Sequence, residues 1–219
     1  MRVDTVTTFF ALLAVLALIV LAVVAVSAVI ARVSGRLPEP LAEARTALGQ
    51  VSLVLAFFVA LTCTLGSLYL SEVAKFPPCD LCWYQRILMY PQVVILGVAA
   101  LRRDASVRWY SVPLVLIGLC ISVYHYLIER FPDTVKFSCD AETPCSTVWV
   151  WKFHFLSIPA MAGIGFALIA VLVMLSAPPA AAGTEPHPSD DTSPESVSTD
   201  ALSTDTRSTD TLSTPEPRT

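Results

Sequence analysis

Two pairs of cysteines have the residue type and spacing best suited to chemistry in this chain. Cys79 and Cys82 form a C-x-x-C motif directly after two prolines, and Cys139 and Cys145 form a second, wider pair. Proline lacks an N–H and restricts its predecessor, so the two prolines are expected to end one helix and let the motif begin the next. A thiolate at a helix N-terminus is stabilised, which favours a labile, exchanging Cys79–Cys82 disulfide.

Two other polar residues lie at a depth that matches the C-x-x-C pair. Arg86 follows Cys82 by four residues and therefore shares its helix face about 6 Å deeper. A guanidinium at that depth either stabilises a thiolate and binds a hydrogen-bond acceptor or extends to the lipid headgroups. His125 lies near the outer end of a later apolar stretch, where it is either a proton relay or a packing residue.

The elements that must position these residues are membrane-spanning helices. The chain has 219 residues, of which 55% are hydrophobic and 15% charged, a composition unlike that of soluble domains. Five stretches have about the length that crosses a bilayer: Phe9–Ala31, Val51–Leu70, Trp83–Leu101, Trp109–Ile128 and Phe155–Leu175. Cys63 and Cys120 lie inside these stretches and are expected to be packing residues. The sequence thus predicts an all-α membrane protein, a four-helix transmembrane bundle plus one extra N-terminal transmembrane helix.

Both cysteine pairs are expected on the same face of the membrane. They lie in the segments Glu72–Cys82 and Glu129–Trp151, and the two helices between these segments return the chain to the same side. Two disulfides indicate an oxidising compartment. The compact basic turn Arg102–Arg108 favours the cytoplasm for the opposite face, although Lys and Arg counts barely differ. We therefore expect a multi-pass cell-membrane protein with extracytoplasmic cysteine loops.

The composition divides the chain into three parts. Residues 1–49 hold the extra helix and a cytoplasmic linker, residues 50–176 the four-helix redox domain, and residues 177–219 a cytoplasmic tail. A retained first helix with its N-terminus outside, rather than a cleaved signal peptide, keeps all four loop cysteines on one face. The tail is acidic and repeats a Ser-Thr-Asp unit, so we expect it to be disordered. The membrane part has no basic cluster that predicts nucleic acid binding.

Two cysteine pairs on one face predict an electron relay by thiol–disulfide exchange. Cys139 and Cys145 lie in a polar loop that a partner protein can reach, whereas Cys79 and Cys82 lie at the membrane edge. The loop pair would exchange with a soluble dithiol and then with the membrane-edge pair through mixed disulfides. The net two-electron, two-proton reaction suits a lipid-soluble quinone. The sequence contains no phosphate-binding, acyl-transfer or metal-hydrolysis motif that competes with this hypothesis.

These residues resemble the DsbB/BdbC family of disulfide bond formation proteins. The resemblance covers about Leu53–Leu175 and is carried by PCDLCWYQR followed by ILMYP, then by CDAETPCS and FHFLSIPA. Vitamin K epoxide reductase relatives place the loop pair before the C-x-x-C, so the order here favours DsbB/BdbC. The short spacing of the second pair is closer to the BdbC branch.

The resemblance implies how electrons would move. A four-helix bundle in the bacterial cytoplasmic membrane would reoxidise a DsbA-like, thioredoxin-fold partner. It would pass the electrons to ubiquinone or menaquinone and so, indirectly, to the respiratory chain. Cys139 would form the mixed disulfide with the partner. Cys145 would resolve it through Cys79, and Cys82 would contact the quinone.

The resemblance also bears on the polar residues near the motif. Arg86 matches the quinone-side arginine of the family, and His125 matches a histidine near the outer end of the third core helix, so both are candidates for binding the quinone. Gln85 stands where some members have a glutamate, and no role is assigned to it. The extra N-terminal helix and the repetitive tail depart from the family pattern and are not expected to join the electron path.

Two other hypotheses remain open from the sequence. One is a non-catalytic membrane scaffold in which the four loop cysteines form structural disulfides. The other is a four-cysteine zinc site, which needs reduced thiols and hence a cytosolic face. The relay hypothesis requires no metal.

Overall fold

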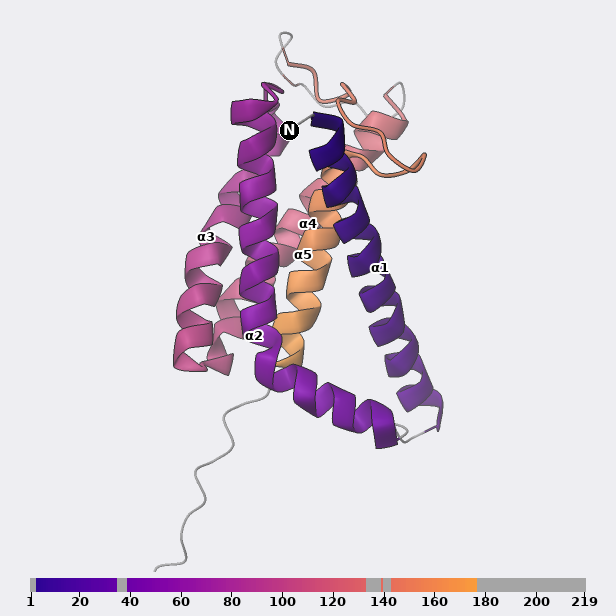
Figure 1. The fold of residues 1–219 in the computed structure, drawn as a ribbon, viewed down its shortest axis with the longest axis vertical. Coiled ribbons are helices and arrows are strands. Elements are labelled where there is room, and N and C mark those ends of the chain that lie inside the picture. Colours follow the sequence, from indigo (N-terminus) through magenta and orange to yellow (C-terminus); the bar gives the residue numbers. More distant parts are fainter. Residues whose placement is uncertain (1–2, 35–38, 133–138, 140–142, 177–219) are drawn as a thin grey trace, which may run out of the picture. The chain divides into compact units, whose positions relative to one another are not determined.

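The computed structural model describes residues 3–34, 39–132, 139 and 143–176; the predicted tail, 177–219, lies outside the described residues. The elements are, in order, α1 (Val3–Ser34), α2 (Glu39–Leu68), the π-helical turn η1 (Tyr69–Val73), α3 (Asp80–Arg102), the 3-10 turn η2 (Ala105–Val107), α4 (Arg108–Arg130) and α5 (Ile158–Leu175) (Figure 1). Five of the described helices are long and apolar enough to cross a membrane. The predicted all-helical membrane class and the extra N-terminal helix are therefore confirmed.

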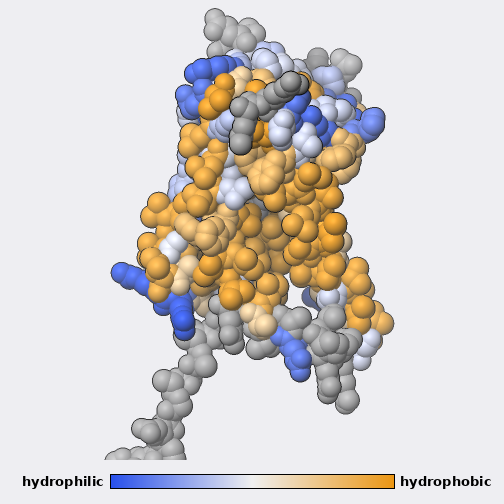
Figure 2. All heavy atoms as spheres, in the orientation of Figure 1, coloured by the Kyte–Doolittle hydropathy of each residue, from blue (hydrophilic) through white to orange (hydrophobic). Residues whose placement is uncertain are grey.

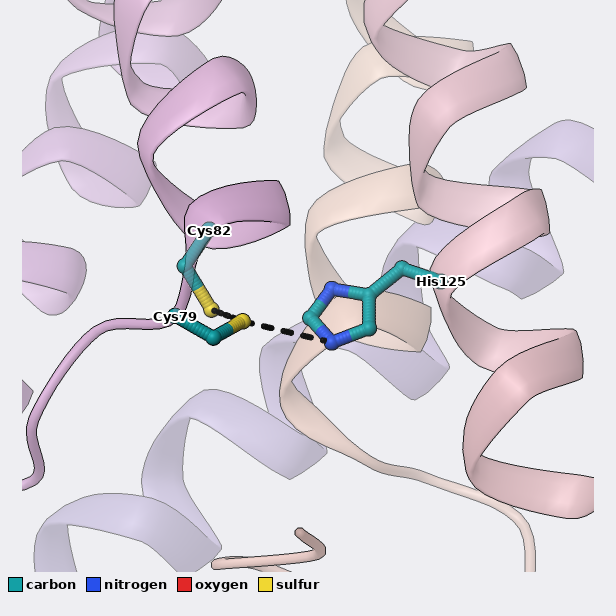
Figure 3. Close-up of side chains that lie close together, drawn as sticks. All are labelled: Cys79, Cys82 and His125. Carbon is teal, nitrogen blue, oxygen red and sulfur yellow. Dashed lines mark hydrogen bonds between the residues drawn. The ribbon is translucent and has the colours of Figure 1, made fainter. Parts of the chain in front are cut away.

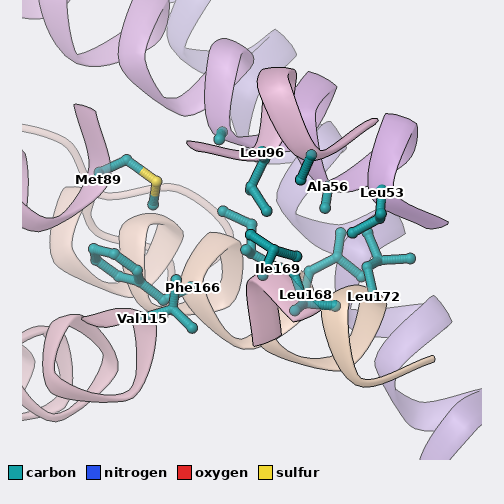
Figure 4. Packing of buried hydrophobic residues seen from close by; sticks show 13 residues of the cluster. Leu53, Ala56, Met89, Leu96, Val115, Phe166, Leu168, Ile169 and Leu172 are labelled. Carbon is teal, nitrogen blue, oxygen red and sulfur yellow. The ribbon is translucent and has the colours of Figure 1, made fainter. Parts of the chain in front are cut away.

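Helices α2 to α5 pack around one apolar core. α5 lies against α4 and α2, α3 contacts α2 and α4, and α1 packs on α5. The core includes the fully buried side chains of Leu96 from α3, Val115 from α4, and Phe166 and Ile169 from α5 (Figure 4). Because lipid tails are as apolar as these side chains, close packing holds the helices together more than exclusion of water does.

The outer surface of the helices is also apolar. Figure 2 shows apolar side chains over the middle of the bundle and polar side chains toward its two ends. Val94 of α3 and Ile117 of α4 are among many large apolar residues that are more than half exposed. A soluble monomer rarely exposes so much contiguous apolar area, whereas lipid-facing helices require it. The surface therefore agrees with the predicted membrane location of the chain.

The two cysteines inside the apolar stretches differ in their surroundings. Cys63 of α2 is partly buried and packs against the core, as predicted. Cys120 of α4 is exposed on the outer surface, so the prediction that it packs inside the protein is wrong. The reason is its place on the helix: Val115 and Gly118 face the core, and Cys120 faces away from it.

At the end of the bundle that carries the cysteines, α3 begins at the C-x-x-C motif, as the sequence predicted. Cys79 is the N-cap of α3, and Cys82 lies in its first turn. The preceding helix ends earlier than expected, because η1 stops at Val73 and Lys75 takes a left-handed φ of 58° before Pro77 is reached. We call this end, formed by residues 74–82, 125–132 and 143–157, the cysteine end.

The opposite end of the bundle holds the start of α2 and the turn between α3 and α4 (Figure 1). α2 begins at Glu39, so the expected linker within residues 1–49 is helical from that point. Arg103 ends α3 with a left-handed φ of 52°. Asp104 then accepts a hydrogen bond of 2.9 Å from the backbone N–H of Ser106, which makes the basic turn tight.

We expect Gly118→Ala to destabilise the bundle, because a methyl group at Gly118 would lie 2.5 Å from the ring of Phe166. That ring is fully buried and has little room to move. Overpacking of this kind costs roughly 1–3 kcal/mol, so the thermal midpoint of the detergent-solubilised protein should fall. Ile117→Ala, a change at the neighbouring exposed position on the same helix, is the control. Equal midpoints for the two variants would contradict the packing described here.

Candidate redox site

Both cysteine pairs gather in one cluster at the cysteine end. Cys79 and Cys145 are buried together with Leu81 and Ile128. Cys82 and Cys139 are partly buried and pack against the same cluster. The sequence predicted that the pairs lie on one face, and the structure brings them into contact range across helices α3 and α4. Of the loop pair, Cys139 is the more exposed and Cys145 the more enclosed.

The two pairs differ in their bonding. Cys139 and Cys145 form a disulfide with their Cα atoms 6.0 Å apart. Cys79 and Cys82 are free thiols whose sulfurs lie 3.1 Å apart, within hydrogen-bonding distance. The short separation follows from the helix: an N-cap residue and a residue of the first turn lie on the same side of α3. A disulfide between Cys79 and Cys82 stays a prediction.

His125 lies between the two pairs, on α4. Its Nε2 atom is 3.7 Å from the sulfur of Cys79 and 3.2 Å from the backbone oxygen of Cys145. Figure 3 shows the imidazole ring pointing from α4 toward the C-x-x-C motif at the start of α3. The ring is only 3% exposed, so its polar atoms depend on these protein partners. His125 therefore connects the motif with the loop disulfide.

Gln85 holds the other side of the imidazole. Its Nε2 amide lies 3.1 Å from Nδ1 of His125, and both side chains are buried. An amide nitrogen donates, so Nδ1 accepts and Nε2 carries the proton of the neutral ring. That proton then faces the Cys145 carbonyl and the Cys79 sulfur. Sequence reasoning assigned no role to Gln85; its spacing of three residues from Cys82 on the same helix face was the available signal.

The surroundings of Cys79 favour its thiolate. The neighbouring Cys82 thiol is the main cause that lowers the pKa of Cys79, and His125 lowers it further through a hydrogen bond. Burial acts in the opposite direction and raises the pKa, but the two polar neighbours outweigh it. A thiolate with a lowered pKa is a good nucleophile and leaving group in disulfide exchange.

A cavity of about 510 Å³ lies beside Cys82. Cys82 and Arg86 line it, whereas Cys79 and His125 do not. The C-x-x-C motif thus has two sides: Cys79 packs toward the loop disulfide, and Cys82 faces the cavity. His125 was a candidate for the acceptor site together with Arg86, but it does not line the cavity, whereas its hydrogen-bond partner Gln85 does.

Arg86 is held in place by α2. Its Nε donates to the Ser67 hydroxyl at 3.0 Å, and one terminal nitrogen donates to the Ser67 carbonyl at 3.2 Å. The Tyr90 hydroxyl donates to the same serine oxygen at 3.2 Å, and the guanidinium lies 5.3 Å from the ring centre of Trp83. These contacts satisfy part of the guanidinium and leave further donors for an acceptor in the cavity. Sequence reasoning missed Ser67, which is 19 residues away from Arg86.

Aromatic contacts hold the loop before α5 over the cluster. The ring of Trp149 stacks on Phe76 with centres 5.2 Å apart, and the Arg130 guanidinium lies 5.2 Å from the ring centre of Trp151. These contacts tie the loop to the segments that follow η1 and α4. They explain why Cys145 stays beside Cys79 although its loop has little regular structure.

The same atoms are also a possible set of metal ligands. The sulfurs of Cys79 and Cys82 and a ring nitrogen of His125 lie within 4.8 Å of one another. Two thiolates and an imidazole are ligands that zinc accepts. The four-cysteine zinc hypothesis needs two more thiolates from Cys139 and Cys145, but these sulfurs are bonded to each other in this structure.

The middle of the chain is similar to known proteins of one kind. The family model described as "Disulfide bond formation protein DsbB" matches residues 49–176. "Disulfide bond formation protein C" of Bacillus subtilis (strain 168) is 46% identical over 126 residues, which cover 57% of this chain and 91% of the relative. "Probable disulfide formation protein" of Oceanobacillus iheyensis is 45% identical over 125 residues, which cover 56% and 86%. No solved structure matches the chain.

We expect His125→Ala to raise the pKa of Cys79, because it removes an imidazole 3.7 Å from the sulfur. In the reduced protein, alkylation of Cys79 by iodoacetamide should then reach half its maximal rate at a higher pH. Cys82→Ala should shift the profile further, since Cys82 is the main cause of the lowered pKa. Tandem mass spectrometry of the Cys79 peptide measures the rate.

His154→Asn is the control for this experiment. His154 is an exposed histidine with a φ of 64°, a conformation that asparagine tolerates. The pH profile of Cys79 alkylation in this variant should match that of the unmodified protein. Superimposable profiles for His125→Ala and the unmodified protein would show that His125 does not act on Cys79.

Proposed function

The chain belongs to the DsbB family of disulfide bond formation proteins, and from this we propose that it is a membrane thiol:quinone oxidoreductase that reoxidises an extracytoplasmic DsbA-like, thioredoxin-fold protein. Its similarity to disulfide bond formation protein C confirms both the family and the branch that the sequence resembled. Membership of this family makes the chain an oxidoreductase of disulfide formation. The quinone, the partner and the roles of single residues belong to the proposal.

The observation that carries the proposal is the position of the C-x-x-C pair. Cys79 packs with the loop disulfide through Cys145, and Cys82 lines the cavity beside Arg86. A dithiol placed between an accessible disulfide and an apolar cavity can take electrons on one side and release them on the other. A scaffold stabilised by disulfides has no need of such a cavity next to an exchanging pair.

The proposed exchange conserves atoms and electrons at each step. A partner thiolate attacks Cys139, which breaks the Cys139–Cys145 bond and frees the Cys145 thiolate. Cys145 attacks Cys79 of an oxidised C-x-x-C, which frees Cys82 as a thiolate. The second partner thiol then attacks Cys139 and releases the oxidised partner. Cys139 attacks Cys145, restores the loop disulfide and leaves the C-x-x-C pair reduced.

Exposure and hydrogen bonds support this order. Cys139 is the more exposed cysteine of the loop pair, so it is the sulfur that a soluble protein reaches. The Nε2 proton of His125 faces the Cys79 sulfur, where it can stabilise the Cys79 thiolate that leaves when Cys139 attacks Cys145. We therefore assign His125 to the thiol exchange rather than to the acceptor. Gln85 positions it through Nδ1.

The cavity beside Cys82 fits a quinone. Arg86 and Ser67 supply hydrogen-bond donors near the thiol, Tyr90 donates its hydroxyl proton to Ser67, and most of the remaining lining is apolar. A bound menaquinone or ubiquinone supplies a two-electron, two-proton acceptor. Arg86 would orient a quinone carbonyl and favour the Cys82 thiolate, while the apolar walls exclude water. Reoxidation of Cys79 and Cys82 to a disulfide then completes the cycle and feeds the respiratory chain indirectly.

We also propose that the cysteine end faces outward from the bacterial cytoplasmic membrane. A disulfide at this end fits an oxidising compartment. The basic turn around Arg103 lies at the opposite end, which fits the cytoplasm. The first residues of α1 meet the cysteine end through an ion pair of 3.5 Å between Asp4 and Lys152, as a helix with its N-terminus outside requires.

We expect Cys82→Ser to abolish reduction of a soluble menaquinone analogue driven by the reduced DsbA-like protein, because a serine oxygen cannot form the disulfide. Absorbance of the quinone measures the rate. Cys120→Ser, a change at the exposed cysteine of α4, is the matched control and should keep full turnover. Full turnover in Cys82→Ser, or failure to trap any mixed disulfide at Cys139, would favour the structural scaffold instead.

We expect Arg86→Gln to raise KM for the quinone about 10- to 100-fold, the range expected when a hydrogen bond from a charged donor is lost. Turnover at saturating quinone should fall less. Arg102→Gln changes an arginine at the other end of α3, away from the cavity, and should leave KM unchanged. Steady-state kinetics with varied quinone measures both constants. An unchanged KM in Arg86→Gln would remove Arg86 from the acceptor site.

A further inference from the structure

The extra helix α1 forms one wall of the cavity beside Cys82. The matched family model begins at residue 49, so α1 lies outside the part of the chain that resembles the family. The α1 residues that line the cavity include Thr7, Phe10, Leu13, Ala14, Ala17 and Val20. The other walls come mainly from α2, the first turns of α3, and α5. A helix added to the family core thus contacts the proposed acceptor site.

Close packing holds α1 in this position. Ala11 and Ala14 are buried together with Leu156, two residues before α5, and pack next to Met161 of α5. Small residues at this spacing allow two helices to approach closely. On the other side, the ring of Phe10 lies 3.0 Å from where a methyl group on Gly66 of α2 would be. α1 therefore touches both α2 and α5.

The cavity has a polar end and a long apolar part. Cys82, Arg86 and Ser67 line the polar end of the cavity. Leu13, Ala17 and Val20 continue its wall toward the other end of α1. From Thr7 to Val20, the helix rises about 20 Å at 1.5 Å per residue. A compact head that accepts hydrogen bonds and a long apolar chain together match this shape. Lipid quinones with isoprenoid tails have that chemistry.

We propose that α1 closes the side of the quinone site between α2 and α5, so that the isoprenoid tail runs in a channel inside the protein rather than along the bilayer. The tail then contacts α1 over several turns, and α1 sets how strongly the enzyme prefers long-tailed quinones. This inference rests on the proposed quinone reaction. It assigns a substrate-selecting role to α1, which lies outside the residues that the family model matches.

A kinetic experiment on the full chain tests the channel. Dithiothreitol is the electron donor, and the acceptors are tail-less menadione and a menaquinone with four isoprene units. Ala17→Phe places a larger side chain in the α1 wall and narrows the channel for the tail. The KM of the long quinone divided by that of menadione should therefore rise about tenfold, a typical effect of a changed fit in an apolar pocket. Ala22→Phe makes the same change at an exposed position of α1 and should leave the ratio as it was.

A second measurement needs no activity. In protein lacking Cys63 and Cys120, the nearly isosteric variant Ala17→Cys should be protected from N-ethylmaleimide by the four-isoprene menaquinone, whereas Ala22→Cys should not. The role of α1 is overturned if Ala17→Phe leaves the KM ratio unchanged. It is also overturned if the quinone does not slow alkylation of the cysteine in Ala17→Cys. Failure of the unmodified protein to reduce menadione at all overturns the proposed function instead.

Discussion

The hydrogen bonds of one buried imidazole hold the redox site together. His125 is buried at the cysteine end of the helical bundle, where water cannot satisfy its two nitrogens. Gln85 of α3 forms a hydrogen bond with Nδ1 of His125. Nε2 faces both the Cys145 carbonyl and the Cys79 sulfur. Because each partner comes from a different segment, these bonds set the distance between the start of α3, the end of α4 and the loop before α5. That distance decides whether two cysteine pairs can exchange.

The asymmetry of the C-x-x-C motif follows from this arrangement. Cys79, the N-cap residue, packs with the loop disulfide, and Cys82, in the first turn, lines the cavity that α2 also lines. The two sulfurs remain 3.1 Å apart, yet their surroundings differ in kind. Cys79 has polar neighbours that favour a thiolate, whereas Cys82 borders an apolar cavity with Arg86 nearby. A single turn of helix thus separates the proposed thiol-exchange chemistry from the proposed acceptor chemistry.

Packing of the described helices is close in some places and leaves room for the cavity in another. α4 and α5 meet closely where Gly118 admits the ring of Phe166, and α5 approaches α2 where Gly165 faces Cys63. Near Ser67 and Arg86 the same helices leave a gap, and α1 covers it from outside. The extra helix is therefore more than an added anchor in the membrane. It also forms one wall of the proposed acceptor site.

The sequence by itself was enough to identify the class of the protein, its five apolar spans and its family. It also pointed to the two cysteine pairs and to Arg86 as candidate site residues. These features are local: span length, C-x-x-C spacing and an arginine one turn after a cysteine are all visible within one segment. The sequence analysis misjudged Cys120 and assigned nothing to Gln85, Ser67 or α1. Each of these depends on which face of a helix points inward, and spans that are apolar on all sides carry almost no signal of their inner face. Tertiary structure alone decided that Gln85 meets a histidine 40 residues away and that Ser67 holds Arg86. It also decided that α1 lies against the cavity, because only packing selects partners that far apart in the chain.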